Sequence, residues 1–316
     1  MGSEPEPDLR RVHGRADPVT VSDLRPDEQS AAPVAAGERT IARRQYGRWV
    51  AAVVIVALAA VVVRQFAVAD IDWGVIPDYL TSGTILRGLW GTVWLTVLAM
   101  VVGIVVGVVV AVMGLSDNPV IKAAANFYLW FFRGIPALVQ LLLWFNIALV
   151  IKDVHLPPFY EGTTNDLVTP LLAAVLGLGL SEGASMGEIV RSGILSVDPG
   201  QAQAAKALGF TQGQTMRRIV LPQAMRVIVP PTGNEVINMT KYTSLAFAVS
   251  YSELLSSATG IYSMNFKVVE LLLTITIWYL ALTTVLMVIQ GWIERRLARS
   301  RGAGPARAGR RKEVKA

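Results

Sequence analysis

The chain has 316 residues, of which 53% are hydrophobic and 16% charged, and its mean hydropathy is +0.48, which indicates an integral membrane protein. It has no cysteine and two histidines, which excludes disulfides, cysteine nucleophiles and metal sites of the His/Cys kind. The net charge of +6 is best interpreted as membrane orientation and contact with anionic lipid, because no nucleic-acid-binding module is recognisable.

Polar tails flank the apolar part of the chain. Residues 1–48 are rich in Pro, Asp, Glu and Arg, and residues 298–316 in Arg, Gly and Ala, so both are predicted to be disordered. Between them we predict an all-α integral membrane protein with about six transmembrane helices, each needing about 20 apolar residues. The predicted spans are residues 49–69, 91–113, 137–151 extended backward to 126, 167–186, 227–249 and 271–292.

The distribution of Lys and Arg predicts the orientation of these spans. Eight Arg precede residue 49, nine Lys or Arg follow residue 292, and residues 191–226 contain five, whereas the three connections on the other side contain only Lys152 and Lys267. Because Lys and Arg are retained on the cytoplasmic side, both termini are predicted to be cytoplasmic. The first span is expected to be an uncleaved anchor, since Arg64 lies within it and a long leader precedes it.

The segment 199–222 is predicted to form a polar helical hairpin on the cytoplasmic side. Asp198 is a good N-cap and Pro199 a favoured first residue, and Gly209 provides a left-handed stop after a helix that ends near Leu208. The small Ala side chains of this helix allow close approach of a partner. The positive charges that surround them belong to Lys206, Arg217 and Arg218.

A second helix should follow immediately. Thr211 and Gln214 have the spacing of a capping box. This helix is expected to end near Leu221, because Pro222 disfavours helical geometry in the residue before it. An ordinary cytoplasmic loop held by positive charge is the alternative interpretation.

The span 227–249 contains polar residues at membrane depth, where they are costly and tend to face a pathway. Asn234, Asn238 and Lys241 recur at helical spacing and share a face, whereas a direct pair of Glu235 with Lys241 requires a broken helix or another copy of the chain. The pair Pro230-Pro231 makes such a break possible. The alternative is an interfacial segment with its lysine extended to the headgroups. The predicted pathway residues are Asn234, Glu235, Asn238, Lys241, Thr243 and Ser244.

Two further patches combine charges with turns. Arg133-Gly134-Ile135-Pro136, with Gln140 downstream, predicts a charge and a turn where a helix meets the membrane, although a plain positive-inside anchor explains Arg133 as well. Glu188 and Arg191 are three residues apart and are predicted to pair across one helical turn, either as a local salt bridge or as a link between two spans.

The hairpin resembles the coupling motif of the membrane subunits of ABC importers. Gln203-Ala204-Ala205, Gly209, Ile219 and Leu221-Pro222 stand at the intervals of that motif, with Gln203 where the family usually has Glu. Residues 85–297 further resemble the polar amino acid importers. The segments that carry this second resemblance are Arg133-Gly134-Pro136, Glu188/Arg191, Leu221-Pro222-Gln223-Ala224, Pro230-Pro231, Gly233-Asn234-Glu235, Lys241-Thr243-Ser244-Leu245 and Glu294-Arg295-Arg296-Leu297.

The resemblance implies a five-helix permease core at 85–297, with its coupling region at 187–226 and an extra helix at 49–69. It further implies a permease subunit in the cytoplasmic membrane that has no catalytic residue, metal or cofactor of its own. The expected partners are ATP-binding subunits that use ATP and Mg²⁺, a second permease subunit, and an extracytoplasmic solute-binding protein. A gradient-driven carrier or channel is the alternative, and a membrane-embedded enzyme using Glu235 and Lys241 as acid and base is a more distant one.

Overall fold

The computed structural model describes residues 46–158 and 160–299, so most of both polar tails lies outside the described residues. The chain divides after Ala69 into two units. In the first unit, α2 (Tyr46–Val68) carries apolar residues on all sides, and none of the residues in its most apolar stretch is buried. A helix that is apolar all round needs an apolar solvent, which supports the predicted first span.

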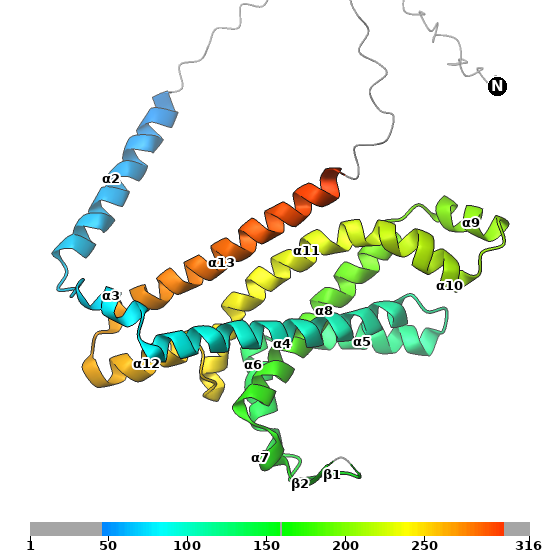
Figure 1. The fold of residues 1–316 in the computed structure, drawn as a ribbon, viewed down its shortest axis with the longest axis horizontal. Helices are drawn as coiled ribbons and strands as arrows, with labels where there is room; N and C mark the ends of the chain where they lie inside the picture. Colours follow the sequence, from blue (N-terminus) through cyan, green and yellow to red (C-terminus); the bar gives the residue numbers. More distant parts are fainter. Residues whose placement is uncertain (1–45, 159, 300–316) are drawn as a thin grey trace, which may run out of the picture. The chain divides into compact units, whose positions relative to one another are not determined.

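The second unit is a helical bundle with one small sheet (Figure 1). Helix starts follow local signals, since the hydroxyls of Ser82 and Thr169 accept from backbone N–H groups three residues later. The α-helices are α3 (Val75–Leu80), α4 (Gly83–Gly114), α5 (Pro119–Gly134), α6 (Ala137–Phe145), α7 (Thr164–Leu167), α8 (Pro170–Leu195), α9 (Pro199–Ala207), α10 (Gln212–Thr215), α11 (Leu221–Tyr242), α12 (Leu254–Asn265) and α13 (Val268–Arg299). The 3₁₀ segments are Ile147–Leu149 and Thr243–Val249, and Met216–Val220 forms a π-helical turn.

Helices α4 and α8 form the centre of this unit because glycines allow their backbones to approach closely. A Cβ atom at Gly107 would lie 2.5 Å from the Cβ of Met186, and one at Gly103 would lie 2.6 Å from the Cγ of Glu182. Small residues at a helix contact allow this close approach of two membrane helices. Buried side chains of α4, α6, α8 and α11 surround the contact.

Four helices of the described residues are long and apolar enough to cross a membrane, namely α2, α4, α8 and α13. The pair α5 and α6 makes a fifth candidate and covers most of the span predicted over 126–151, but as two helices that meet at a bend of 99°. Pro136 precedes α6, and Ile135 is extended, which ends α5. Helix α11 forms where the sixth span was predicted, but it is too polar to qualify on apolar length alone.

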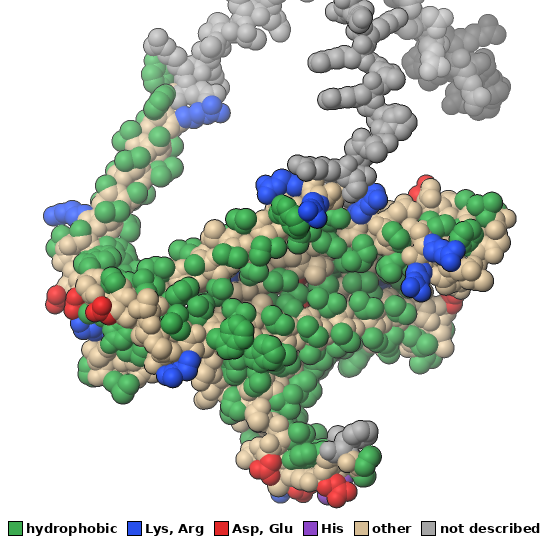
Figure 2. Space-filling view, viewed as in Figure 1, with side chains coloured by type: hydrophobic (Ala, Val, Ile, Leu, Met, Phe, Trp, Pro, Cys, Tyr) green, Lys and Arg blue, Asp and Glu red, His purple; other side chains and the backbone are tan. Residues whose placement is uncertain are grey.

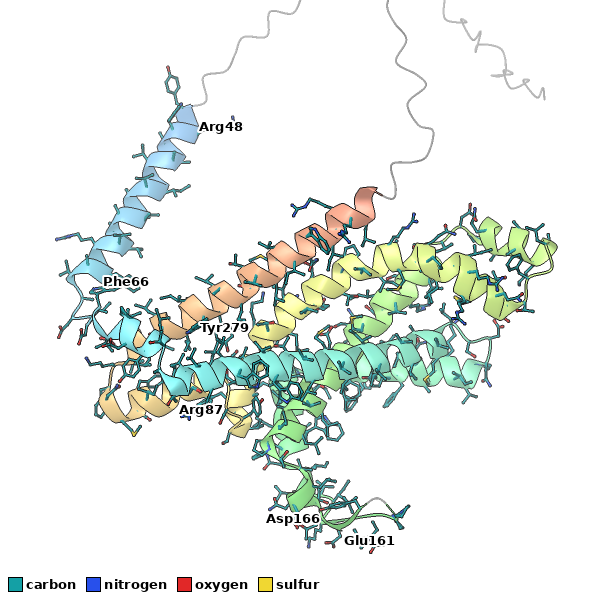
Figure 3. The ribbon with its side chains drawn as sticks, viewed as in Figure 1. Arg48, Phe66, Arg87, Glu161, Asp166 and Tyr279 are labelled. Carbon is teal, nitrogen blue, oxygen red and sulfur yellow. The ribbon has the colours of Figure 1, made fainter. Side chains whose placement is uncertain are left out.

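A two-stranded antiparallel sheet lies between α6 and α7. Strand β1 (Asp153–Leu156) pairs with β2 (Tyr160–Thr163), with Asp153 opposite Thr163. Glu161 and Asp166 lie at this hairpin, far from the α9–α10 end of the unit (Figure 3). The sequence analysis predicted an outer connection here but no strands.

Candidate functional site: a coupling hairpin and a polar cleft

The hairpin between α8 and α11 begins with α9, and its ends match the sequence signals. The carboxylate of Asp198 accepts from the N–H of Gly200 at 2.8 Å. At the other end Gly209 has φ of +80°, Phe210 N donates to Ala205 O at 3.1 Å, and Gly209 N donates to Lys206 O at 3.0 Å. This is a Schellman motif, so the predicted N-cap and glycine stop are confirmed.

The second half of the hairpin begins as predicted and ends differently. Gln214 N donates to the hydroxyl of Thr211 at 3.3 Å, and Thr211 N donates to Gln214 Oε1 at 2.9 Å, which completes the capping box. The prediction that this helix ends near Leu221 is wrong. A π-helical turn connects it to α11, so Pro222 falls in the first turn of a new α-helical segment, where a residue without N–H is tolerated.

The hairpin is therefore continuous with α11. The surface of the hairpin combines an apolar tip with positive charge. Leu208 is 78% exposed, and Lys206, Arg217 and Arg218 are also exposed. Figure 2 shows Lys and Arg side chains at this end of the unit. Among the predicted coupling residues, Gln203, Ala204, Gly209, Leu221 and Pro222 are exposed, Ile219 is half-buried and Ala205 is buried.

Helix α11 presents its polar residues in more than one direction. Gln290 Nε2 of α13 donates to Asn234 Oδ1 at 3.0 Å and to Pro230 O at 2.8 Å, so Asn234 ties two helices together. The helix is unbroken through the two prolines. Accordingly, no ion pair joins Glu235 to Lys241 within the described residues.

The remaining pathway residues differ in exposure. Lys241 is exposed, and Glu235, Asn238 and Ser244 are half-buried. Thr243 is fully buried and donates to Thr240 O at 2.8 Å, so the prediction that it lines a pathway is wrong for this conformation. The 3₁₀ geometry that follows α11 turns this side chain into the interior.

Gln140 holds the bend between α5 and α6. It is 2% exposed, and its Nε2 donates to the carbonyls of Phe132 and Ile135 at 2.9 Å each. These carbonyls have lost helical partners at the bend, so Gln140 replaces the missing backbone donors. Its predicted structural role rests on this contact, while Pro136 begins the new helix.

Glu188 pairs with Arg133 of α5, so its predicted pairing with Arg191 is wrong. The side chain of Arg191 lies along α4 instead, where a Cβ at Gly114 would lie 3.6 Å from its Cδ. Its Nε is buried without a hydrogen-bond partner among the described residues. Glu188 therefore links two helices, which is the alternative role that the sequence analysis gave to this patch.

These residues meet in a polar cleft of about 490 Å³. Segments far apart in the chain contribute to it: α5 provides Arg133, α8 provides Glu188 and Arg191, and α11 provides Glu235. Sequence analysis predicted these four residues separately but did not bring them together. It missed the other lining residues, Ser185, Ile189, Ser192 and Leu195, which recur along α8 at helical spacing.

A larger hollow of about 1020 Å³ is lined mostly by apolar residues of α4, α8, α11 and α13. Gln290 and Glu294 are among its few polar lining residues. The hairpin also contributes, through Gln212 and Met216. The hairpin thus lines the same hollow as the membrane helices.

Comparisons with known proteins agree with this geometry. The family described as "Binding-protein-dependent transport system inner membrane component" matches residues 103–299. The arginine transport system permease protein ArgU of Corynebacterium glutamicum is 42% identical over 255 residues, 80% of each chain. The glutamine transport system permease protein GlnP of Escherichia coli is 30% identical over 203 residues, which cover 59% of this chain and 87% of that protein.

Solved structures agree on the fold. A chain from "Crystal structure of an amino acid ABC transporter with histidines" has a TM-score of 0.62 and 32% identity, covering 72% of this chain and all of that one. A chain of the MetNI methionine ABC transporter, 20% identical, has a TM-score of 0.54 and covers 67% of this chain and 95% of that one, which shows the fold alone. The chain belongs to the family of inner membrane components of binding-protein-dependent transport systems, and it is a permease subunit of the ABC importer type.

Proposed function

We propose that this chain forms the pathway of an ATP-driven importer of polar amino acids. The substrate class is supported by the relatives, which are named as transport proteins for arginine and glutamine. In this proposal ATP and Mg²⁺ are used by separate ATP-binding subunits, and the chain holds no cofactor. A second permease subunit completes the pathway, and an extracytoplasmic solute-binding protein delivers the substrate.

The continuity of the hairpin with α11 carries the proposal. The exposed tip of α9 is a surface for the ATP-binding subunits, and the π-helical turn transmits its displacement into the helix that carries Glu235. Movement of a helix that lines both hollows changes their access to either side of the membrane. The docking surface on α9 and the pathway are then coupled, because α11 connects them and can take up two positions.

The same proposal places the chain in the cytoplasmic membrane with both termini in the cytoplasm. The Lys and Arg of the α9–α10 hairpin and the end of α13 then face the cytoplasm, where anionic lipid attracts them. The β1–β2 hairpin lies on the extracytoplasmic side, toward the solute-binding protein.

The docking step is tested with one apolar residue of the hairpin and a matched control. Leu208→Glu should weaken copurification of the ATP-binding subunits on the order of 10- to 100-fold, because burying a leucine contributes about 1.5–3 kcal/mol. Leu149→Glu is the control, since Leu149 is 79% exposed in the 3₁₀ segment that follows α6, much like Leu208 at 78%. Equal binding by both variants would contradict the proposal.

A further inference from the structure

The larger hollow is apolar over most of its lining, which does not suit the polar substrate proposed above. Val108 of α4 and Met225 of α11 line it and are 42% exposed, and Ile289 of α13 is 49% exposed, so the hollow is open to an occupant. Its volume of about 1020 Å³ lies at the upper end of the range of ligand sites, roughly 300–1,000 Å³. An apolar wall offers a polar solute no hydrogen bonds, so the group that fills this hollow is apolar.

The hollow has the depth of one leaflet of the bilayer. Along α4 its lining runs from Ile104 to Leu115, which is about 17 Å at 1.5 Å per residue. Half of the hydrocarbon core of a bilayer is about 15 Å thick. The lining residues of α8 and α13 also lie in the half of each helix that is nearer the hairpin. A spanning helix of another subunit would need a groove through both leaflets, whereas a lipid tail needs only one.

The polar residues at the mouth of the hollow indicate the kind of headgroup. Asp117 after α4, Gln212 of the hairpin and Glu294 near the end of α13 lie at the hairpin end, and among the described residues that line the hollow none is Lys or Arg. The exposed Arg217 and Arg295 directly follow lining residues in the chain. Carboxylates with arginines next to them match a headgroup that carries an ammonium beside a phosphate better than a purely anionic one.

The apolar wall suits a flexible chain. Met186, Met216 and Met225 line the hollow from α8, the π-helical turn and α11. Methionine is unbranched and adapts its shape to irregular apolar groups. Such a wall accommodates an acyl chain in several conformations.

We propose that the hollow binds a phospholipid with a zwitterionic, amine-bearing headgroup, such as phosphatidylethanolamine, from the leaflet on the hairpin side. Its acyl chain lies between α4, α8, α11 and α13, and its ammonium group donates to the carboxylates of Asp117 and Glu294. Gln212 and Met216 place the same lipid against the coupling hairpin. The inference goes beyond the proposed function, because it concerns a lipid that the chain binds and not the substrate that it carries.

The test is photo-crosslinking of lipid to the purified complex of this chain with its ATP-binding subunits in phosphatidylcholine vesicles. A small amount of phosphatidylethanolamine carries a diazirine at the end of one acyl chain, and the labelled residues are identified by mass spectrometry. Adducts should lie on residues 225–236 of α11 and 286–293 of α13. Val108→Trp, which fills the hollow, should lower them about tenfold. Val109→Trp, the same change at a neighbouring exposed position outside the lining, should leave them unaltered.

Competition between lipids tests the headgroup. Unlabelled phosphatidylethanolamine should lower the adducts more than the same amount of phosphatidylglycerol, which has no ammonium group. The double variant Asp117→Asn with Glu294→Gln should abolish this difference, because it removes both carboxylates from the mouth. The control is Asp153→Asn with Asp166→Asn, which removes two exposed carboxylates outside the hollow and should preserve the difference.

Three results would overturn this inference. They are equal adducts in Val108→Trp and wild type, equal competition by the two lipids in wild type, and a lack of adducts on the lining residues because a second subunit covers the hollow. If Val108→Trp does not assemble, the competition in wild type and in the Asp117 and Glu294 double variant decides, since those substitutions leave the apolar wall intact. None of these results bears on ATP-driven uptake, which tests the proposed function separately.

Discussion

Replacing Gly209 with valine tests the coupling hairpin without disturbing any packing. A Cβ atom at this position would meet no atom within 4 Å, so the substitution adds no steric contact. The only obstacle is the backbone, because φ is +80° and β-branched residues avoid that region. The Schellman motif that sets the angle between α9 and α10 should therefore be lost in a fraction of molecules.

The size of the effect of Gly209→Val follows from the backbone conformation at residue 209 alone. A left-handed backbone costs an L-residue roughly 1–2 kcal/mol, which lowers the population of the native turn by a factor of about 5 to 30. Gly209→Asn should retain most of the function, since asparagine tolerates this geometry far better than valine. The loss should appear as poor coupling, because the altered turn transmits less of the partner's movement to α11.

The assay is the ratio of substrate imported to ATP hydrolysed in liposomes that contain the complete transporter. Gly213→Val is the matched control, because its added Cβ also meets no atom within 4 Å and its φ is not positive. We expect the ratio to fall several-fold for Gly209→Val and to stay near wild type for Gly213→Val. Full coupling by Gly209→Val, or equal damage by both, would refute the reasoning.

Three further predictions concern polar contacts of the bundle. Gln140→Leu removes the donor to two carbonyls at the α5–α6 bend and should lower the free energy of unfolding by about 1–3 kcal/mol, measured by denaturation of the purified chain. A double-mutant cycle on Arg133 and Glu188 should give a coupling of at most about 1 kcal/mol in the same assay, because both side chains are about half exposed; a clearly larger value would contradict a surface pair. Lys267 donates a hydrogen bond that lowers the pKa of Asp72, so their contact is complete above the ordinary value of 3.8 and is lost as the pH falls through the lower folded value. The amide hydrogen-exchange rate of residues 70–80, corrected for the intrinsic pH dependence of exchange, should rise in that acid range in wild type. In Lys267→Gln it should already be raised at neutral pH, and identical rate–pH profiles for the two proteins would contradict the assignment.

Local sequence signals were sufficient for the hairpin and insufficient for its connection. The N-cap at Asp198 and the stop at Gly209 depend on residues within one turn, so the sequence predicts them directly. The fate of Pro222 depends on the π-helical turn before it, which no local pattern announces. The same holds for the 3₁₀ turn that buries Thr243.

Contacts between residues far apart in the chain were the second feature that the sequence did not predict. Glu188 and Arg191 have the spacing of a helical pair, but Glu188 pairs with Arg133 of α5 instead. The side chain of Arg191 packs against Gly114 of α4. Gln290 gave no signal of its own, and its contact with Asn234 arises only because α11 and α13 pack together. A single sequence does not encode such pairings in its periodicity, whereas apolar length predicts the spans themselves.

ATP, not an ion or voltage gradient, should drive the import of a polar amino acid through this chain. The most direct measurement is uptake of labelled acidic, amide, basic and sulfur-containing amino acids by cells with and without the chain, while cellular ATP and the membrane potential are collapsed separately. We predict that one class of uptake disappears without the chain and depends on ATP in its presence. Uptake that follows the membrane potential and ignores ATP would contradict the account in favour of a gradient-driven carrier.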